Sequence, residues 1–121
     1  MDNNKIIFLK QYNIDVDKGI ENTADFETYN EILTDYFNEL PNEINKLVTF
    51  LNNNDLTNYS ITVHALKSNS RCLGFTTFGE ICYKHEMESK AGNKNFIMSN
   101  FNVLSDEAKK VYAIIQKYMT I

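Results

Sequence analysis

The sequence predicts an all-α fold, an antiparallel four-helix bundle with short N-terminal helical elements, and three observations lead to this prediction. Apolar residues recur at steps of three and four along most of the chain, as they do on one face of an α-helix. Glycine and proline are scarce, with four Gly and one Pro in 121 residues, which leaves few turns for a fold made of short strands. The length also suits a single core. We therefore expect one domain over residues 1–121, in which residues 1–24 cover a bundle formed by residues 25–121.

The N-terminal part of the chain has the least regular pattern, and we expect residues 6–9 and 15–20 to form short helical pieces over one end of the bundle. Asp25 then precedes a clear helical stripe and is a good N-cap, because its carboxylate can accept hydrogen bonds from the free amides of a first turn. Pro41 suits the first turn of another helix, where its missing N–H needs no partner. The sequence thus predicts one helix up to residue 40 and a second from Pro41 to residue 51. The inward residues of the two helices are Phe26, Tyr29, Leu33, Tyr36, Phe37 and Leu40, and then Ile44, Leu47, Val48 and Leu51.

Three more helices are predicted after residue 52. Asp55 can cap the next one, and Gly74 can end it, because glycine readily adopts the left-handed conformation common after a helix C-terminus. Thr77 and Glu80 have the spacing of a capping box for a helix that ends at residues 92–93. The inward residues of these helices are Leu56, Tyr59, Val63, Leu66 and Leu73, then Phe78, Ile81, Cys82, His85 and Ser89, and finally Ile97, Phe101, Leu104, Ala108, Val111, Ile115 and Tyr118.

Charge and composition exclude several classes of protein. The net charge of −4 and the pI near 5.1 argue against a surface for nucleic acid or anionic membranes. The N-terminus has only a four-residue apolar run, which is too short for a signal peptide or a membrane span. Two cysteines are too few for a secreted disulfide scaffold. We therefore expect a cytoplasmic monomer with no membrane insertion and no nucleic-acid partner.

The helix predicted between Asp55 and Gly74 presents His64 to solvent. On a helical wheel with Leu56 at 0° and about 100° per residue, the residues predicted to face the core lie at about 300°. His64 lies at about 80°, which is about 140° away from them. Lys67, Ser68 and Arg71 fall on the same exposed face, so we expect a cationic strip around an imidazole nucleophile. Since an exposed histidine on a helix is usually only solvated, its position alone assigns no function.

The order of residues around His64 is more specific than its position. The segment "HALKSNSRCLG" (64–74) resembles the signature of histidine-containing phosphotransfer (HPt) domains, which is approximately His-x-Leu-Lys-Gly-small-small-x-x-aliphatic-Gly. The similarity extends through residues 78–93 and reaches back over residues 14–40. This sequence departs from the pattern at Ser68, where the family usually has Gly, and at His85, where it usually has Leu. The residues that match the signature are His64, Leu66, Lys67, Ser70, Leu73 and Gly74.

The resemblance implies a phosphorelay intermediate. In this role His64 accepts a phosphoryl group from the aspartate of a response-regulator receiver domain, or donates one to it, and a sensor or hybrid histidine kinase completes the relay. Lys67, supported by Ser68 and Arg71, would offset the charge of the phosphoryl group. The sequence has no phosphate-binding loop and no acidic cluster near His64, so Mg²⁺ is expected in the partner receiver domain and no cofactor in this chain. We therefore expect a phosphocarrier and not an enzyme.

A docking surface is predicted beside His64. Ile61, Ala65 and Cys72 lie on the flank of the same helix and, together with Ser68, could give a partner an apolar contact. A half-buried flank without a partner is the alternative for these residues. For the chain as a whole, the alternative to phosphotransfer is a helical interaction module of the same fold without that activity.

Residue spacing argues against two possible metal sites. A zinc site of His64, Cys72, Cys82 and His85 would need residues that lie about 12 Å apart along one helix and on different helical faces. The segment "DVDKGIE" (15–21) looks like the start of a calcium loop, but its glycine stands at the fifth position where such loops have it at the sixth. We expect a helix cap or a loop there and no metal in the chain.

Overall fold

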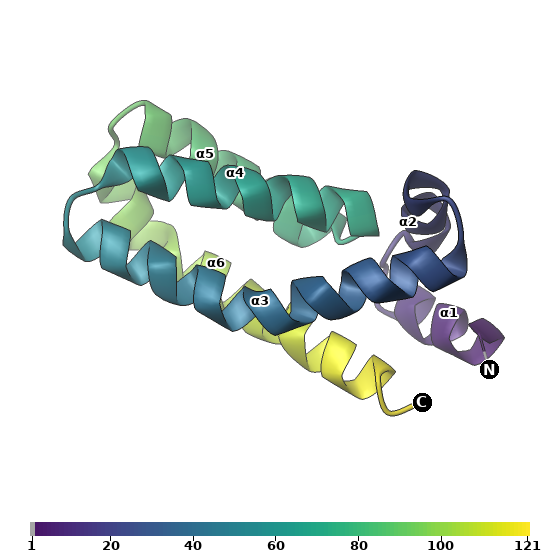
Figure 1. Ribbon diagram of the computed structural model, residues 1–121. Coiled ribbons are helices and arrows are strands. Elements are labelled where there is room, and N and C mark those ends of the chain that lie inside the picture. Colours follow the sequence, from purple (N-terminus) through teal and green to yellow (C-terminus); the bar gives the residue numbers. More distant parts are fainter. Residues whose placement is uncertain (1) are drawn as a thin grey trace.

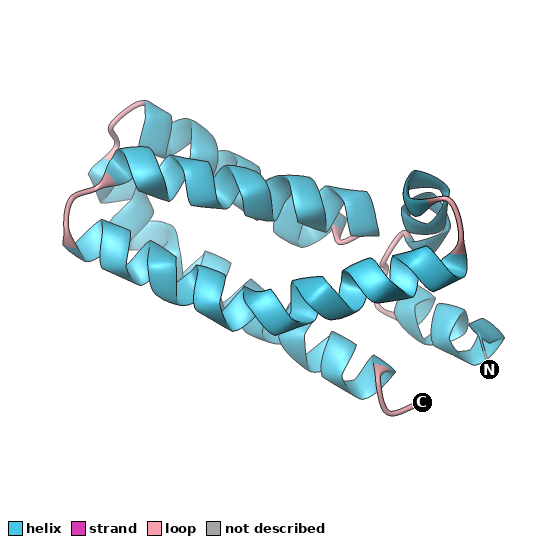
Figure 2. Ribbon diagram, in the orientation of Figure 1, coloured by secondary structure: helices cyan, strands magenta, loops and turns pink. Residues whose placement is uncertain are grey.

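The computed structural model describes residues 2–121, so Met1 lies outside it, and within those residues it contains six α-helices, short loops and no strand (Figure 2). Helices α3 to α6 run alongside one another as an antiparallel bundle, and α1 and α2 lie at one end of it (Figure 1). The all-α prediction is confirmed. The helices are α1 (Asp2–Gln11), α2 (Val16–Thr23), α3 (Phe26–Asn52), α4 (Leu56–Leu73), α5 (Thr76–Lys90) and α6 (Lys94–Tyr118).

Helix α3 is continuous, so the prediction of a new helix at Pro41 is wrong. A proline inside a helix costs about 3 kcal/mol because it removes one backbone hydrogen bond and crowds the preceding turn. Here Pro41 is exposed, while Leu40 and Leu47 on either side of it are buried in the same core. Burial before and after the proline thus keeps the helix in one piece. Val48, predicted to point inward, has 39% of its surface exposed, because Leu47 occupies the core at this turn.

The aspartate caps form as predicted. Asp25 and Asp55 each accept a hydrogen bond from the amide three residues further on, at 2.7 and 3.1 Å. Asp15 does the same for α2 at 3.2 Å, so residues 15–21 begin a helix.

The capping box at Thr77 and Glu80 does not form. Helix α5 begins two residues earlier than a Thr77 cap would place it, and its N-cap, Phe75, makes no side-chain hydrogen bond to the first turn. Only Gly74, at φ 91°, and Phe75 separate α4 from α5, and Phe75 is anchored in the core with 3% of its surface exposed. This short turn fixes the start of α5. Glu80 is left free to bind Arg71 across the two helices, at 2.9 Å.

The C-terminal end of α4 is held by the N-terminal part of the chain. The last carbonyls of a helix have no partner within the helix and need donors from elsewhere. Here Cys72 accepts from the Asn22 side chain, Leu73 from the Tyr29 hydroxyl and Gly74 from the Asp15 amide, at 3.1, 2.7 and 3.0 Å. Gly19 permits this close approach of α2, because a Cβ at that position would lie 2.9 Å from the Leu73 carbonyl oxygen. The helix that carries His64 is therefore fixed at one end by α2 and α3.

The core lies between the four long helices and also takes in residues of α1 and α2, such as Leu9 and Val16. Ser70, one of the small residues of the signature segment, is fully buried and shares a 2.7 Å hydrogen bond with the Tyr36 hydroxyl. A larger residue there would have to displace packed neighbours. Within residues 2–121, no helix is both long enough and apolar enough to cross a membrane.

Candidate functional site

His64 projects from the exposed side of α4, as predicted. Its neighbours Val63 and Leu66 are buried, with 0% and 3% of their surfaces exposed, and they fix the rotation of the helix. The His64 side chain is 56% exposed as a result. The imidazole is thus accessible to another protein.

Glu86 of α5 lies directly beside the imidazole. Its Oε2 atom is 2.7 Å from His64 Nδ1 and also accepts a hydrogen bond from Lys90 Nζ at 2.9 Å. Its other oxygen, Oε1, accepts from Lys67 Nζ at 2.6 Å. Only 5% of the Glu86 side chain is exposed. A buried carboxylate therefore joins the histidine to two lysines.

The charge of Glu86 decides which nitrogen of His64 is available. Burial alone would raise the pKa of Glu86, but the hydrogen bonds from Lys67, Lys90 and His64 lower it to about 2. The carboxylate is therefore ionised at neutral pH and can only accept hydrogen bonds. It follows that Nδ1 of His64 carries the proton. In the neutral ring Nε2 then has a free lone pair, and no group within residues 2–121 makes a hydrogen bond to it.

The two cations on α4 are paired with side chains of α5. Lys67 is bound to Glu86 and is only 14% exposed, while Arg71 is 41% exposed and binds Glu80 at 2.9 Å. Both cations also lie over the ring of Tyr83, at 5.4 and 5.1 Å from its centroid. Ser68 and Arg71 lie on the exposed side of α4 with His64, as expected for the cationic strip, but Lys67 is largely covered, because the two-residue turn between the helices packs α5 against that side of α4.

Glu86 is the site residue that the sequence interpretation missed. It stands 22 residues after His64, so their contact depends on how α4 and α5 pack. One signal was present in the sequence. Glu86 falls between Cys82 and Ser89, which were predicted to face the core, and a carboxylate so close to a buried stripe needs cationic or hydrogen-bonding partners.

The residues of the predicted docking surface lie around His64 with different exposures. Ile61 has 61% of its surface exposed, which is high for so apolar a side chain. Ala65 and Ser68 are exposed on the same side of α4, while Cys72 is only partly exposed. Three of the four residues are thus accessible together with the imidazole.

The second histidine, His85, lies in the core. Only 1% of its surface is exposed, and its Nδ1 atom shares a 2.8 Å hydrogen bond with the Tyr59 hydroxyl. Burial lowers the pKa of His85 to about 4, although a hydrogen bond with the Asn100 backbone opposes this shift. Cys82 is buried as well, and burial raises the pKa of its thiol to about 12. His64 is thus far more exposed than the other two, and within residues 2–121 no three His, Cys, Asp or Glu side chains are placed to hold a metal ion.

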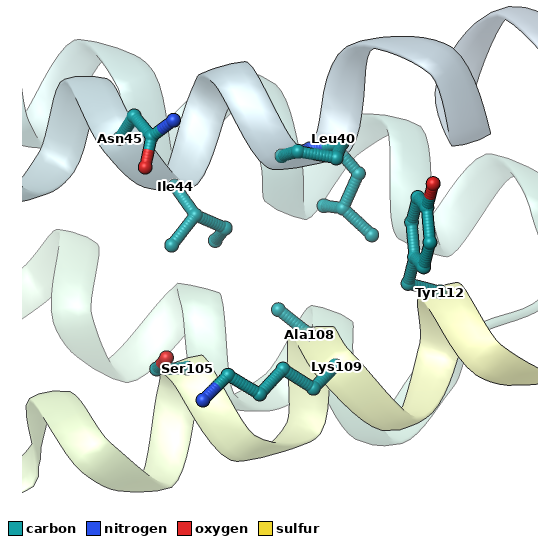
Figure 3. Close-up of a pocket in the computed structure, with 8 residues that line it drawn as sticks. Leu40, Ile44, Asn45, Ser105, Ala108, Lys109 and Tyr112 are labelled. Atoms are coloured by element: carbon teal, nitrogen blue, oxygen red, sulfur yellow. The ribbon is translucent and has the colours of Figure 1, made fainter.

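A separate groove of about 270 Å³ lies between α3 and α6 (Figure 3). It is mostly apolar and shares no residue with the surface around His64. Its lining residues are Leu40, Pro41, Ile44, Asn45, Ser105, Ala108, Lys109 and Tyr112.

A comparison with protein families identifies the family to which the chain belongs. The family model of the Hpt domain matches residues 31–112, which is more than half of the chain and extends from α3 into α6. The chain therefore belongs to the Hpt domain family, as the resemblance of its signature segment implied. Members of this family are phosphocarrier modules of histidine phosphorelays and not catalysts, and they interact with receiver domains and kinases. No curated protein and no solved structure matches the chain.

Proposed function

We propose that this protein carries a phosphoryl group in a phosphorelay, with Nε2 of His64 as the acceptor. One observation carries the proposal: the exposed imidazole donates a hydrogen bond from Nδ1 to the buried, ionised Glu86, which leaves Nε2 as a nucleophile. A phosphorelay partner must reach this atom, and the exposure of His64 permits that.

Transfer of the phosphoryl group from an aspartyl phosphate to His64 needs no further reagent. The Nε2 lone pair attacks the phosphorus of an aspartyl phosphate, the bond from phosphorus to the aspartate oxygen breaks, and the aspartate leaves as a carboxylate. The phosphoryl group is then bonded to Nε2 while Nδ1 keeps its proton, and the reverse reaction returns the group to an aspartate. Mg²⁺ in the receiver domain would stabilise the phosphoryl oxygens. This chain supplies the nucleophile and its orientation.

The cations near His64 have a supporting role in the proposal. Lys67 and Arg71 bring positive charge toward the transferred group, but both are held by acidic partners on α5. Their contribution should be modest, since the charge of each cation is already partly neutralised by its acidic partner. Ser68, one helical turn beyond His64, limits how closely the partner approaches and can donate a hydrogen bond to a phosphoryl oxygen.

The partner in the proposal is a receiver domain that docks on Ile61, Ala65, Ser68 and Cys72, the surface that adjoins His64. A sensor or hybrid histidine kinase supplies the phosphoryl group through such a receiver. We propose that the protein acts in the cytoplasm as a monomer, since one copy contains both the nucleophile and the docking surface.

The test is transfer from receiver domains phosphorylated with a small-molecule phosphodonor in the presence of Mg²⁺. Intact-mass measurement should show one added phosphoryl group on the parent protein and none on His64→Gln, with matching circular dichroism spectra. A label that persists in His64→Gln would refute the assignment of the site. If no receiver in a broad panel transfers a phosphoryl group, the alternative of an interaction module without phosphotransfer activity is favoured.

A further inference from the structure

We infer that Glu86 sets the lifetime of the phosphorylated protein, by holding on Nδ1 of His64 the proton that makes the phosphorylated imidazole ready to release its phosphoryl group. The inference rests on the proposed function and extends it from the acceptance of the group to its release. A phosphocarrier must release the phosphoryl group as well as accept it. The contact between Glu86 and His64 affects the release.

The chemistry of release depends on the ring proton. When the bond between phosphorus and Nε2 breaks, its electron pair returns to Nε2, and the phosphoryl group passes to water or to an aspartate oxygen. With a proton on Nδ1 the ring leaves as neutral imidazole. Without that proton it would have to leave as an imidazolate anion, which is a much poorer leaving group. The phosphorylated state is therefore labile at pH values where Nδ1 remains protonated.

The geometry favours retention of the proton. Phosphorylation at Nε2 uses the nitrogen that is not bound to Glu86, so the 2.7 Å contact from Nδ1 to Oε2 can persist. A ring that carries both the phosphoryl group and the Nδ1 proton is cationic at the nitrogens, and the carboxylate stabilises it through a charge-assisted hydrogen bond. Because Glu86 is only 5% exposed, solvent screens this attraction weakly.

Other charged groups lie around the imidazole on three helices. Lys67 on α4 and Lys90 on α5 oppose a further positive charge, but each already donates to Glu86. On α3, Glu39 and Glu43 line a hollow together with Ala65, the residue next to His64, and they do not bind the imidazole. Glu86 is thus the only carboxylate, within residues 2–121, that bonds the ring.

The experiment loads the protein chemically with phosphoramidate and follows loss of the label by intact mass from about pH 5 to about pH 9. Parent and Glu86→Gln are compared. A charge-assisted hydrogen bond of this kind corresponds to a change of about one pH unit in the midpoint of the lifetime profile. We expect the midpoint of Glu86→Gln to move to lower pH, so that the label survives about tenfold longer than in the parent at about pH 8.

Two control variants separate the ring proton from general charge effects. Glu80→Gln removes a carboxylate from the same helix that binds Arg71, so its profile should match the parent. Lys90→Gln removes a cation that opposes the ring proton and leaves Glu86 in place, so its midpoint should move to higher pH, opposite to the shift in Glu86→Gln. An unchanged midpoint in a folded Glu86→Gln would overturn the inference. If that variant does not fold, Glu86→Asp withdraws the carboxylate by one methylene and should shift the midpoint in the same direction, and a parental profile there would overturn the inference instead.

Failure of this inference can be told apart from failure of the proposed function. Loading with phosphoramidate needs no receiver domain, and His64→Gln identifies the labelled residue. Absence of transfer from every receiver would count against the proposed function whatever the lifetimes are. Transfer to His64 together with an unchanged profile in Glu86→Gln would leave the function standing and remove the inference alone.

Discussion

The two histidines of this protein show how differently one side chain can be used within a single bundle. Each has its Nδ1 atom in one short hydrogen bond, at 2.7 Å to Glu86 for His64 and at 2.8 Å to Tyr59 for His85. His64 is 56% exposed as a side chain, however, whereas His85 has only 1% of its surface exposed.

The difference lies in the partner and in the second nitrogen. Glu86 is a charged acceptor that orients the His64 ring and leaves Nε2 accessible. At His85 the partner is a neutral hydroxyl, the Asn100 backbone provides a second hydrogen bond, and only 1% of the residue's surface is exposed. A histidine can thus act as a nucleophile when its second ring nitrogen is accessible, and has a structural role when the ring is buried and both nitrogens are hydrogen-bonded.

The largest contrast is expected from replacing each histidine by glutamine. His64→Gln should lose the phosphoryl label entirely, while its free energy of unfolding changes little, because the side chain is exposed and a glutamine amide can still donate a hydrogen bond to Glu86. His85→Gln should keep the label and lose stability, since it disturbs a packed site. Intact mass and urea unfolding measure the two effects. Loss of the label from a folded His85→Gln would show that the two sites are not independent.

The pH dependence of stability should also separate the two regions. The pKa of His85 is about 4 in the folded state, below its ordinary value of 6.5, so the unfolded chain binds the proton more readily. The stability due to His85 is therefore complete above pH 6.5 and is lost as the pH falls toward about 4, by up to about 1.4 kcal/mol per pH unit. Glu86, with a folded pKa of about 2 against 4.5, contributes stability that is lost only between pH 4.5 and about 2.

Urea unfolding at several pH values checks this prediction. His85→Leu should flatten the profile between pH 6.5 and about 4 and leave the loss at lower pH in place. His64→Gln serves as the control and should keep the upper slope. A parental slope in His85→Leu would mean that another group titrates there.

A double-mutant cycle tests whether the bond between Tyr59 and His85 is structural. His85→Leu leaves the Tyr59 hydroxyl buried without its partner, which should cost about 1–3 kcal/mol of unfolding free energy. Adding Tyr59→Phe removes the unpaired hydroxyl, so the double variant should recover part of that loss. Simple additivity in chemical denaturation would contradict this account. Phosphotransfer should remain close to the parental rate in all three variants.

The smallest effect is expected from the cations beside His64. Lys67→Ala should slow transfer by about two- to fivefold, because its charge is already shared with Glu86. Arg71→Ala should change the rate less, since Arg71 is paired with Glu80 and more exposed. Initial rates of transfer from one phosphorylated receiver measure both. Complete loss of transfer in Lys67→Ala would show a direct role in the reaction.

The sequence predicted the placement of His64 because that prediction depends only on local geometry. Apolar residues fix which side of α4 is buried, and the exposed side follows at about 100° per residue. The caps at Asp25 and Asp55 could be predicted for the same reason, since each involves one turn of helix.

The features that could not be predicted depend on packing between elements. Glu86 meets His64 only because the turn at Gly74 sets the register of α5 against α4. The continuity of α3 through Pro41 likewise depends on burial along both halves of that helix, which local propensity does not report. The roles proposed for Lys67 and for the docking surface remain predictions.

The attachment of α2 to the end of α4 has a consequence for how the chain folds. The Asn22 side chain and the Cys72 carbonyl that it binds are 50 residues apart in the sequence, so this contact closes a long loop at an entropic cost that more local contacts do not carry. Long-range contacts of this kind are expected to form after the α4 and α5 hairpin, whose two helices meet across a two-residue turn. The Hpt match begins at residue 31, beyond Asn22. A polypeptide started there would lack all three donors to the last carbonyls of α4, those of Asp15, Asn22 and Tyr29, and the last turn of the His64 helix should then fray first in amide hydrogen exchange.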